Sequence, residues 1–212
     1  MIDGSSFDSF ALEYDSWFDR HQWAFDSELL ALSRCIPVRG EGLEVGVGTG
    51  RFAVSLRVRY GVEPAKALAT IAKSREVEVS IGRAEALPYK KNWFDFTLFV
   101  TTLCFVSDPV KSLEEARRVL KIGGRIIIGM IDEDAPPGKP YAKKRADNEF
   151  YKGARFYPVQ QVSDWLASLG FAEIATHQTI FGDVASLDRT DEVREGHGDG
   201  LFVAICAKKP VL

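Results

Sequence analysis

The fold of this chain is decided by the stretch Leu43-Glu44-Val45-Gly46-Val47-Gly48-Thr49-Gly50. A short apolar run gives way to glycines at alternate positions, and Phe52, Ala53 and Leu56 then recur with the period of a helix. The pattern predicts a strand, a tight turn and a helix. Because glycine lacks a side chain and accepts positive φ, this turn can bend sharply and approach a bound molecule closely. We therefore expect a ligand cradle here.

An acid ends the next apolar run, which spans Tyr60 to Glu63. In a strand–helix–strand unit, an acid at the end of the second strand can accept hydrogen bonds from both hydroxyls of a ribose. The glycine turn and Glu63 together predict a cofactor that contains a nucleoside. A dinucleotide fold requires G-x-G-x-x-G, but here Gly50 comes one residue early and Arg51 occupies the position of the third glycine.

The remaining pattern, E-x-G-x-G-x-G followed by an acid about 20 residues later, resembles the class I S-adenosylmethionine-dependent methyltransferases. Two further blocks resemble the family in the same order. They are Gly82-Arg83-Ala84-Glu85-Ala86-Leu87-Pro88, similar to the turn beside the adenine, and the helix-turn-strand signature from Glu114 to Arg125. The resemblance implies a glycine turn against the methionine end of S-adenosylmethionine and an acid, Glu63, on its ribose.

The chain departs from the family at Arg83, where an aspartate usually accepts the amino hydrogen of adenine. Arginine only donates. The adenine contact is therefore assigned to the backbone of Ala84, with Glu85 as an alternative acceptor. The full set of cofactor contacts that the resemblance implies is Glu44, Gly46, Gly48, Gly50, Glu63, Ala84, Glu85 and Thr101.

The resemblance also implies an α/β fold, Rossmann-like, with a seven-stranded mixed sheet, helices on both faces and an antiparallel last strand. The near-continuous apolar run Phe94 to Val100 is typical of a central parallel strand, and Thr101 follows at the edge where such sheets place their ligands. We expect one domain, in which residues 1–38 form a helical lid, 39–131 the cofactor-binding core, 132–157 an insertion or cap, and 158–212 a helix and the closing strands. The helix from Pro109 to Leu120 is expected to stop at Gly123-Gly124.

An aromatic segment near the N-terminus has helical spacing. It either simply packs on the domain or also covers the cofactor and lines the acceptor pocket, and both interpretations stay open. The residues that we predict to bind the acceptor are Tyr14, Trp17, His21, Cys104 and Tyr151. His21 and Tyr14 are the candidate catalytic bases, whereas His177, in a predicted strand, and His197, in a glycine turn, are interpreted as structural.

Composition limits the partners. The 212 residues suit one domain, and 46% hydrophobic with 27% charged residues is typical of a globular protein. A net charge of −3 argues against a nucleic-acid partner, and no apolar run is long enough to cross a membrane. Cys35, Cys104 and Cys206 lie far apart without C-x-x-C spacing, so no disulfide framework and no metal site is expected. We expect a cytoplasmic protein and leave its oligomeric state open.

Three functional hypotheses follow. The first is a methyltransferase that acts on a small molecule, similar to the group that includes the quinone-biosynthesis methyltransferases. The Asn/Asp-Pro-Pro-Tyr/Phe tetrapeptide of the base-amino methyltransferases is absent after Val100, which argues against methylation of nucleic-acid bases. The second is a non-catalytic S-adenosylmethionine-binding sensor or partner subunit, and the third is a nucleotide-dependent oxidoreductase, against which the glycine spacing argues.

Overall fold

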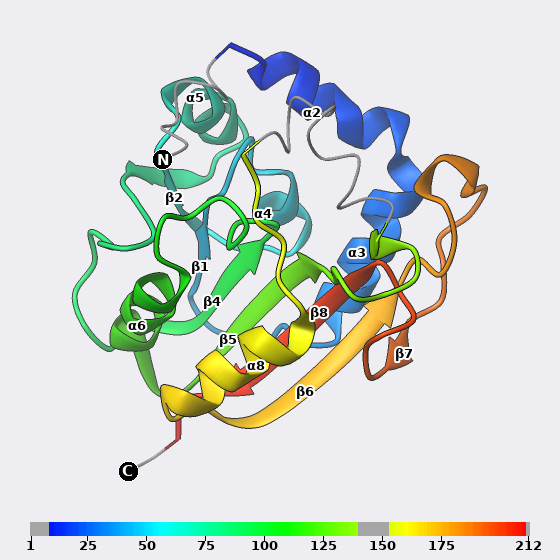
Figure 1. The fold of residues 1–212 in the computed structure, drawn as a ribbon. Coiled ribbons are helices and arrows are strands. Elements are labelled where there is room, and N and C mark those ends of the chain that lie inside the picture. The colour runs from blue at the N-terminus through cyan, green and yellow to red at the C-terminus, as the bar shows by residue number, and fades with distance from the viewer. Residues whose placement is uncertain (1–8, 140–152, 211–212) are drawn as a thin grey trace.

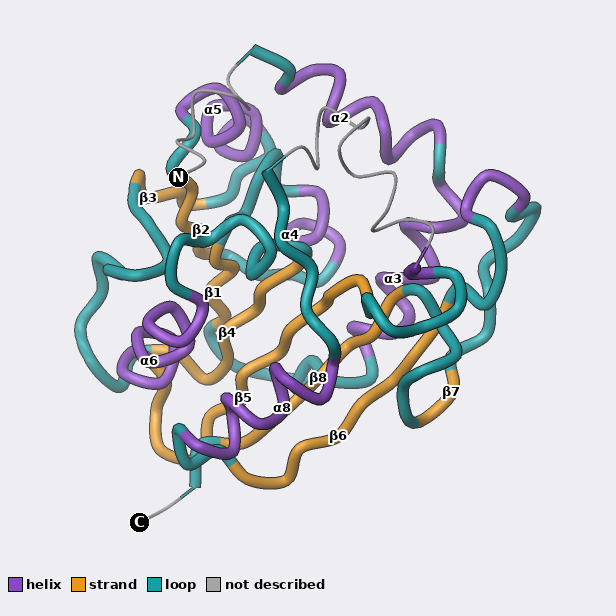
Figure 2. Tube along the Cα trace, in the orientation of Figure 1, coloured by secondary structure: helices purple, strands orange, loops and turns teal. Residues whose placement is uncertain are grey.

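A computed structural model describes residues 9–139 and 153–210 of the chain. The helices are α2 (Ala11–Arg20), α3 (Gln22–Ser33), α4 (Arg51–Ser55), α5 (Lys66–Ser74), α6 (Pro109–Val119) and α8 (Val159–Ser168), with a short 3-10 turn η2 (Val184–Ser186). The strands are β1 (Gly42–Val45), β2 (Tyr60–Glu63), β3 (Glu78–Ile81), β4 (Phe94–Val100), β5 (Leu120–Ile131), β6 (Ala172–Thr179), β7 (Arg194–Glu195) and β8 (Phe202–Lys208). Figure 2 shows these strands gathered in one sheet between helices.

The described strands form an eight-stranded mixed sheet in the order β3-β2-β1-β4-β5-β8-β6-β7. β1 to β5 run parallel to one another, and β8 enters antiparallel between β5 and β6. The antiparallel last strand is thus confirmed. The predicted count of seven is one too low, because the charged turn before β8 pairs Glu195 with His177 and Arg194 with Gln178 as a two-residue outer strand.

Each face of the sheet has its own hydrophobic cluster. β4 contributes to both clusters: Phe94 and Phe99 pack with α6 and α8, whereas Phe96 and Leu98 pack with α3 and α4. The register shift between Phe94 and Phe96 breaks the simple alternation of faces. In Figure 1, α6 and α8 lie in front of the strands, and α3 lies behind them. The prediction of helices on both faces is confirmed, since a sheet buried on both faces needs a covering layer on each.

The helix after β4 ends earlier than predicted. α6 stops at Val119, Leu120 is already extended, and the predicted stop at Gly123-Gly124 lies inside β5. Gly123 has φ +78, and a Cβ on Gly124 would come within 2.9 Å of the Asp95 carbonyl oxygen. The two glycines therefore do not cap the helix. They allow β5 to pair irregularly with β4, where the register shifts between Phe94 and Phe96. Within residues 9–139 and 153–210, no helix has both the length and the apolar character that crossing a membrane requires.

Candidate functional site

A pocket opens at the carboxyl ends of β1, β2 and β4, the edge at which an open α/β sheet binds ligands. It encloses about 960 Å³ of space, part of it open to solvent. The segments that line it come from the glycine turn, the ends of β2 and β4, the loop after β3, and α2. Its lining residues are Tyr14, Gly46, Gly48, Val62, Glu63, Pro64, Leu68, Gly82, Arg83, Ala84, Glu85, Val100, Thr101, Thr102, Phe105 and Val106.

The glycine turn has the geometry that its sequence predicts. Gly46, Gly48 and Gly50 have φ values of 72°, 54° and 83°, a region that side chains rarely tolerate. A Cβ on Gly46 would come within 2.5 Å of the Thr102 side chain, so this turn packs directly on the end of β4. Gly50 does not line the pocket; it precedes α4 and packs against Ala72 of α5.

Two carboxylates lie beside the turn. Glu63 accepts hydrogen bonds from the amides of Gly48 and Ala65, each at 2.9 Å, and lines the pocket. Glu44 does not line it, and its buried Oε2 has no hydrogen-bond partner among the described residues. Burial raises the pKa of Glu44 well above its usual range, the charge of Glu63 adds to this, and the amide of Ala53 opposes it. The turn thus has one acid at the pocket wall and one buried behind it.

The loop after β3 forms another wall. Ala84 is buried and lines the pocket. The carboxylate of Glu85 accepts hydrogen bonds from the amides of Ser107, at 2.8 Å, and Asp108, at 3.4 Å. Arg83 lies 3.7 Å from Glu85 and donates to the Ser107 hydroxyl. Glu85 therefore ties this loop to the segment after β4, while the Ala84 backbone faces the pocket with no bulky side chain over it.

The end of β4 is strained where it meets the pocket. Thr101 has φ 47°, an unusual conformation for a β-branched residue, and such strain is typical of functional sites. Its carbonyl oxygen accepts a hydrogen bond from the Cys104 thiol at 3.1 Å. Burial raises the pKa of Cys104, so the thiol stays protonated and is a poor nucleophile. Cys104 lies behind the residues that line the pocket.

Helix α2 contributes Tyr14, whose ring lies over the glycine turn: a Cβ on Gly48 would be 3.5 Å from its Cε1. Burial raises the pKa of the Tyr14 hydroxyl, and the carboxylates of Glu63, Glu44 and Glu28 raise it further. Trp17 and His21 stack on each other, with ring centroids 4.5 Å apart, and neither lines the pocket. The ring Nδ1 of His21 lies 3.0 Å from the Trp17 carbonyl oxygen. Tyr151 falls outside the described residues.

Glu28 of α3 does not line the pocket, but its charge acts on Tyr14, which does, and the sequence patterns did not single it out. Helix α3 buries a stripe that contains Ala24, Ser27, Ala31 and Leu32, and Glu28 occupies the middle of that stripe. Burial raises the pKa of Glu28 to about 8, although part of its surface remains reachable by solvent. Glu28 lies four residues after Ala24 and three before Ala31, so the helical period places its carboxylate on the face that α3 buries. An acid on a buried face is unusual, and this spacing was the signal that could have identified it.

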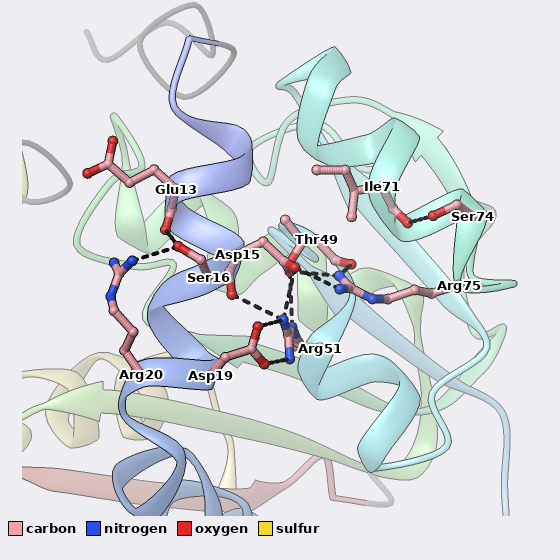
Figure 3. Close-up of polar contacts among 10 residues, drawn as sticks. All are labelled: Glu13, Asp15, Ser16, Asp19, Arg20, Thr49, Arg51, Ile71, Ser74 and Arg75. Carbon is pink, nitrogen blue, oxygen red and sulfur yellow. Dashed lines mark hydrogen bonds and ion pairs between the residues drawn. The ribbon is translucent and has the colours of Figure 1, made fainter.

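A network of charges holds α2 on the turn (Figure 3). Arg51, the residue that breaks the dinucleotide pattern, donates to Asp15 and to Asp19. Arg75, at the end of α5, donates to both oxygens of Asp15 and to the carbonyl oxygen of Thr49. Spacing along the chain does not reveal this network, because Asp15 lies 36 residues from Arg51 and 60 from Arg75.

Comparison with known proteins gives consistent results. Residues 43–128 match the family model of a methyltransferase domain. An uncharacterized protein of Methanocaldococcus jannaschii is 48% identical over 203 residues, covering 96% of this chain and 98% of that protein. A demethylmenaquinone methyltransferase of Oceanobacillus iheyensis is 30% identical over 142 residues, covering 57% of this chain and 58% of that enzyme.

A crystal structure from Thermotoga maritima is similar along nearly the whole chain. It is described as an S-adenosylmethionine-dependent methyltransferase and a possible histamine N-methyltransferase. Its TM-score is 0.94 at 44% identity, covering 97% of this chain and 99% of that chain. Because this similarity spans the glycine turn, the whole sheet and the N-terminal helices together, the chain belongs to the class I S-adenosylmethionine-dependent methyltransferases.

Proposed function

We propose that this protein binds S-adenosylmethionine in the pocket beside the glycine turn and transfers its methyl group to a small molecule that carries a basic amine. The observation that carries the proposal is the placement of two carboxylates. Glu63 lines the wall beside the turn, and Glu28, a partly buried residue of α3 outside the pocket lining, is near enough to Tyr14 to raise the pKa of its hydroxyl. The first suits a ribose and the second suits a cation.

The described residues fit the cofactor. Gly48 exposes backbone to the pocket without a side chain, and Glu63 lines the same wall with its carboxylate. We infer that Glu63 would accept from the ribose hydroxyls and that the Ala84 backbone would contact the adenine. The bound cofactor supplies a methyl group already activated on a sulfonium.

The protein's own task is then to position the acceptor. Holding two reactants collinear and close contributes up to ~7 to 11 kcal/mol, and such a reaction needs no nucleophilic residue of the protein. The aromatic faces of Tyr14 and Phe105, which line the pocket, would stabilise a nearby cation by ~0.5 to 2 kcal/mol each. Helix α2, held by Asp15, would keep water out of the pocket.

The amine is inferred from Glu28. No hydrogen bond or ion pair to Glu28 occurs among residues 9–139 and 153–210, although its pKa is raised to about 8 by burial. A carboxylate without a partner in a largely buried position is costly, and an ammonium group would remove that cost by pairing with it. Because nitrogen accepts a methyl group only through a free lone pair, the ammonium would first give its proton to Glu28, and the transfer would then leave S-adenosylhomocysteine as the second product. The description of the Thermotoga maritima relative as a possible histamine N-methyltransferase supports the same acceptor class.

The test is a methyl-transfer assay on the purified chain with S-adenosylmethionine and a panel of acceptors, read as formation of S-adenosylhomocysteine. The panel contains histamine, other primary amines, and a demethylated quinol as the non-amine acceptor. We expect turnover with amines. The variant Glu28→Gln should lower kcat/KM for the amine by roughly 10- to 150-fold, the worth of a charge-assisted hydrogen bond. The matched control Glu13→Gln, on the exposed side of α2, should leave it unchanged.

Each alternative has its own outcome. Methylation of the quinol alone would overturn the amine proposal and leave the cofactor assignment intact. Binding of S-adenosylmethionine without turnover of any acceptor would favour the non-catalytic sensor. Absence of S-adenosylmethionine binding in calorimetry would overturn the proposal as a whole.

A further inference from the structure

Away from the pocket, the fold brings together three side chains that are distant in sequence. Cys35 follows the last turn of α3, His177 lies in β6, and Cys206 lies in β8. One ligand atom from each, the two sulfurs and a ring nitrogen, lies within 4.8 Å of the other two. None of the three lines the pocket.

The sheet register explains the juxtaposition. In the antiparallel pair β6–β8, Ala175 lies opposite Cys206 and His177 lies opposite Ala204. Residues two apart on a strand share a face, so His177 and Cys206 are diagonal neighbours on one face of the sheet. That face is the one that α3 covers, because Cys35, Leu32 and Ala204 belong to the same hydrophobic cluster. The end of α3 thus places Cys35 over both strands.

We propose that Cys35, His177 and Cys206 form a zinc site that joins α3 to β6 and β8. Two thiolates and an imidazole are a ligand set that Zn²⁺ prefers. A triangle with sides of at most 4.8 Å has its centre no more than about 2.8 Å from each corner. Zinc ligands lie at about 2.0 to 2.3 Å, so a small side-chain adjustment closes the site around the ion. The fourth position is left for water.

The surroundings favour metal binding. Cys35 is buried, whereas His177 and Cys206 are partly exposed, which leaves an entry path for an ion. The three ligand atoms come from three different elements, so an ion bound between them would join the end of α3 to β6 and β8. The expectation of no metal site rested on spacing along the chain, which does not show contacts between α3, β6 and β8.

The experiment uses the full chain, reduced with a phosphine and freed of metal by a chelator. Co²⁺ is added as the spectroscopic probe, and Zn²⁺ is then added to displace it. We expect one equivalent of Co²⁺ to produce thiolate-to-cobalt charge transfer and the visible bands of a tetrahedral site. Zn²⁺ at a hundred times its Kd should also raise the Tm by roughly 5 to 10 °C.

Variants assign the ligands. Cys206→Ser should lower the intensity of the charge-transfer band by at least half, because only the Cys35 thiolate remains, and His177→Gln should weaken Co²⁺ binding at least tenfold. The matched control Cys104→Ser removes a thiol outside the cluster and should keep the full signal. Circular dichroism identifies any variant that fails to fold, and because both test residues are partly exposed, two independent substitutions are available.

Three outcomes would overturn the proposal. The first is that the reduced chain gives no thiolate-to-cobalt band with Co²⁺. The second is that Cys206→Ser and His177→Gln both keep the band intensity and the Co²⁺ affinity of the wild type. The third is that the reduced chain binds no Co²⁺ and that mass spectrometry finds a Cys35–Cys206 disulfide after exposure to air. That result would identify the two cysteines as a redox couple.

Discussion

Asp15 of α2 accepts two parallel hydrogen bonds from Arg75, with Nη1–Oδ1 and Nη2–Oδ2 distances of 2.8 Å each. The same Arg75 Nη1 donates to the Thr49 carbonyl oxygen at 2.7 Å. Since Thr49 belongs to the glycine turn, one guanidinium joins the N-terminal helix, the turn and the end of α5. Asp15 directly follows Tyr14 in the sequence, so its ion pair with Arg75 holds the Tyr14 ring over Gly48.

The substitution Asp15→Asn removes the charge at the centre of this network. The Asp15 side chain is only 16% exposed, so we expect the free energy of unfolding at pH 7 to fall by ~1 to 3 kcal/mol. Asp19→Asn is the control, because that side chain is 65% exposed and should contribute little. Urea denaturation measures both. Equal effects of the two substitutions would show that Asp15 has no special role.

The pH dependence of this effect has a definite sign. Burial alone raises the pKa of Asp15, but the hydrogen bonds from Arg75 and Arg51 outweigh it and hold the pKa well below its usual range. The stabilisation is therefore present above the ordinary pKa of an aspartate, near 3.8, and is lost as pH falls toward the folded value. The difference between the wild type and Asp15→Asn should be smaller at pH 3 than at pH 7.

Local patterns predicted the parts of the site that depend on backbone. The glycine turn, the acid at the end of β2 and the edge of β4 follow from residues that are close in sequence, and Glu63, Ala84 and Thr101 line one pocket. Side-chain partners across elements were not predictable in this way. Glu85 lines the same pocket, but the hydrogen bonds that its carboxylate accepts from the amides after β4 could not be read from the sequence.

The same distinction explains the N-terminal segment. Its aromatic spacing correctly indicated a helix, whereas the place of Tyr14 among the residues that line the pocket comes from the structure. Spacing predicts that Trp17 and His21 are neighbours, because residues four apart lie side by side on a helix. It could not show that this pair lies outside the lining of the pocket. Cys35 and Cys206 come together only because of the order of the strands in the sheet. That order was not visible in the sequence, because the charged turn before β8 contains the two-residue strand β7.

The two alanine substitutions in the glycine turn should have different effects. Gly46→Ala places a Cβ within 2.5 Å of Thr102 at φ 72°, so we expect a loss of folding stability. Gly48→Ala meets no clash, since its Cβ would lie 3.5 Å from Tyr14, so its cost in stability is only the strain of φ 54°, ~1 to 2 kcal/mol, but it covers the backbone that faces the pocket. It should fold and bind S-adenosylmethionine at least tenfold more weakly. Thermal unfolding and calorimetry on both variants separate these effects, and normal affinity in Gly48→Ala would show that the cofactor does not approach the turn.

Glu63→Ala tests the ribose contact. We expect S-adenosylmethionine binding to weaken by roughly 1.5 to 3 kcal/mol, the worth of charge-assisted hydrogen bonds, measured by calorimetry. The control is Glu78→Ala on the neighbouring strand β3, where the exposed carboxylate pairs with Arg59. Because Glu63 also accepts from the amides of Gly48 and Ala65, its removal should loosen the turn as well. Unchanged affinity would remove Glu63 from the cofactor site.

Glu28 gives a prediction of opposite sign to that of Asp15. Burial raises its pKa from 4.5 to about 8, so between these values the folded chain binds more protons than the unfolded chain. This carboxylate therefore destabilises the fold progressively as pH rises from 4.5 to about 8. Relative to the wild type, Glu28→Gln should gain on the order of 2 to 4 kcal/mol in free energy of unfolding between pH 5 and pH 9.

Urea denaturation at pH 5, 7 and 9 measures the gain, and Glu13→Gln, on the exposed side of α2, is the control. If the difference in free energy of unfolding between Glu28→Gln and the wild type does not change with pH, the Glu28 carboxylate ionises normally in the folded chain. An amine that pairs with Glu28 should stabilise the wild type most strongly above pH 8, where the unliganded carboxylate is charged. The same amine should stabilise Glu28→Gln much less, which connects the stability of the fold to the chemistry of the acceptor.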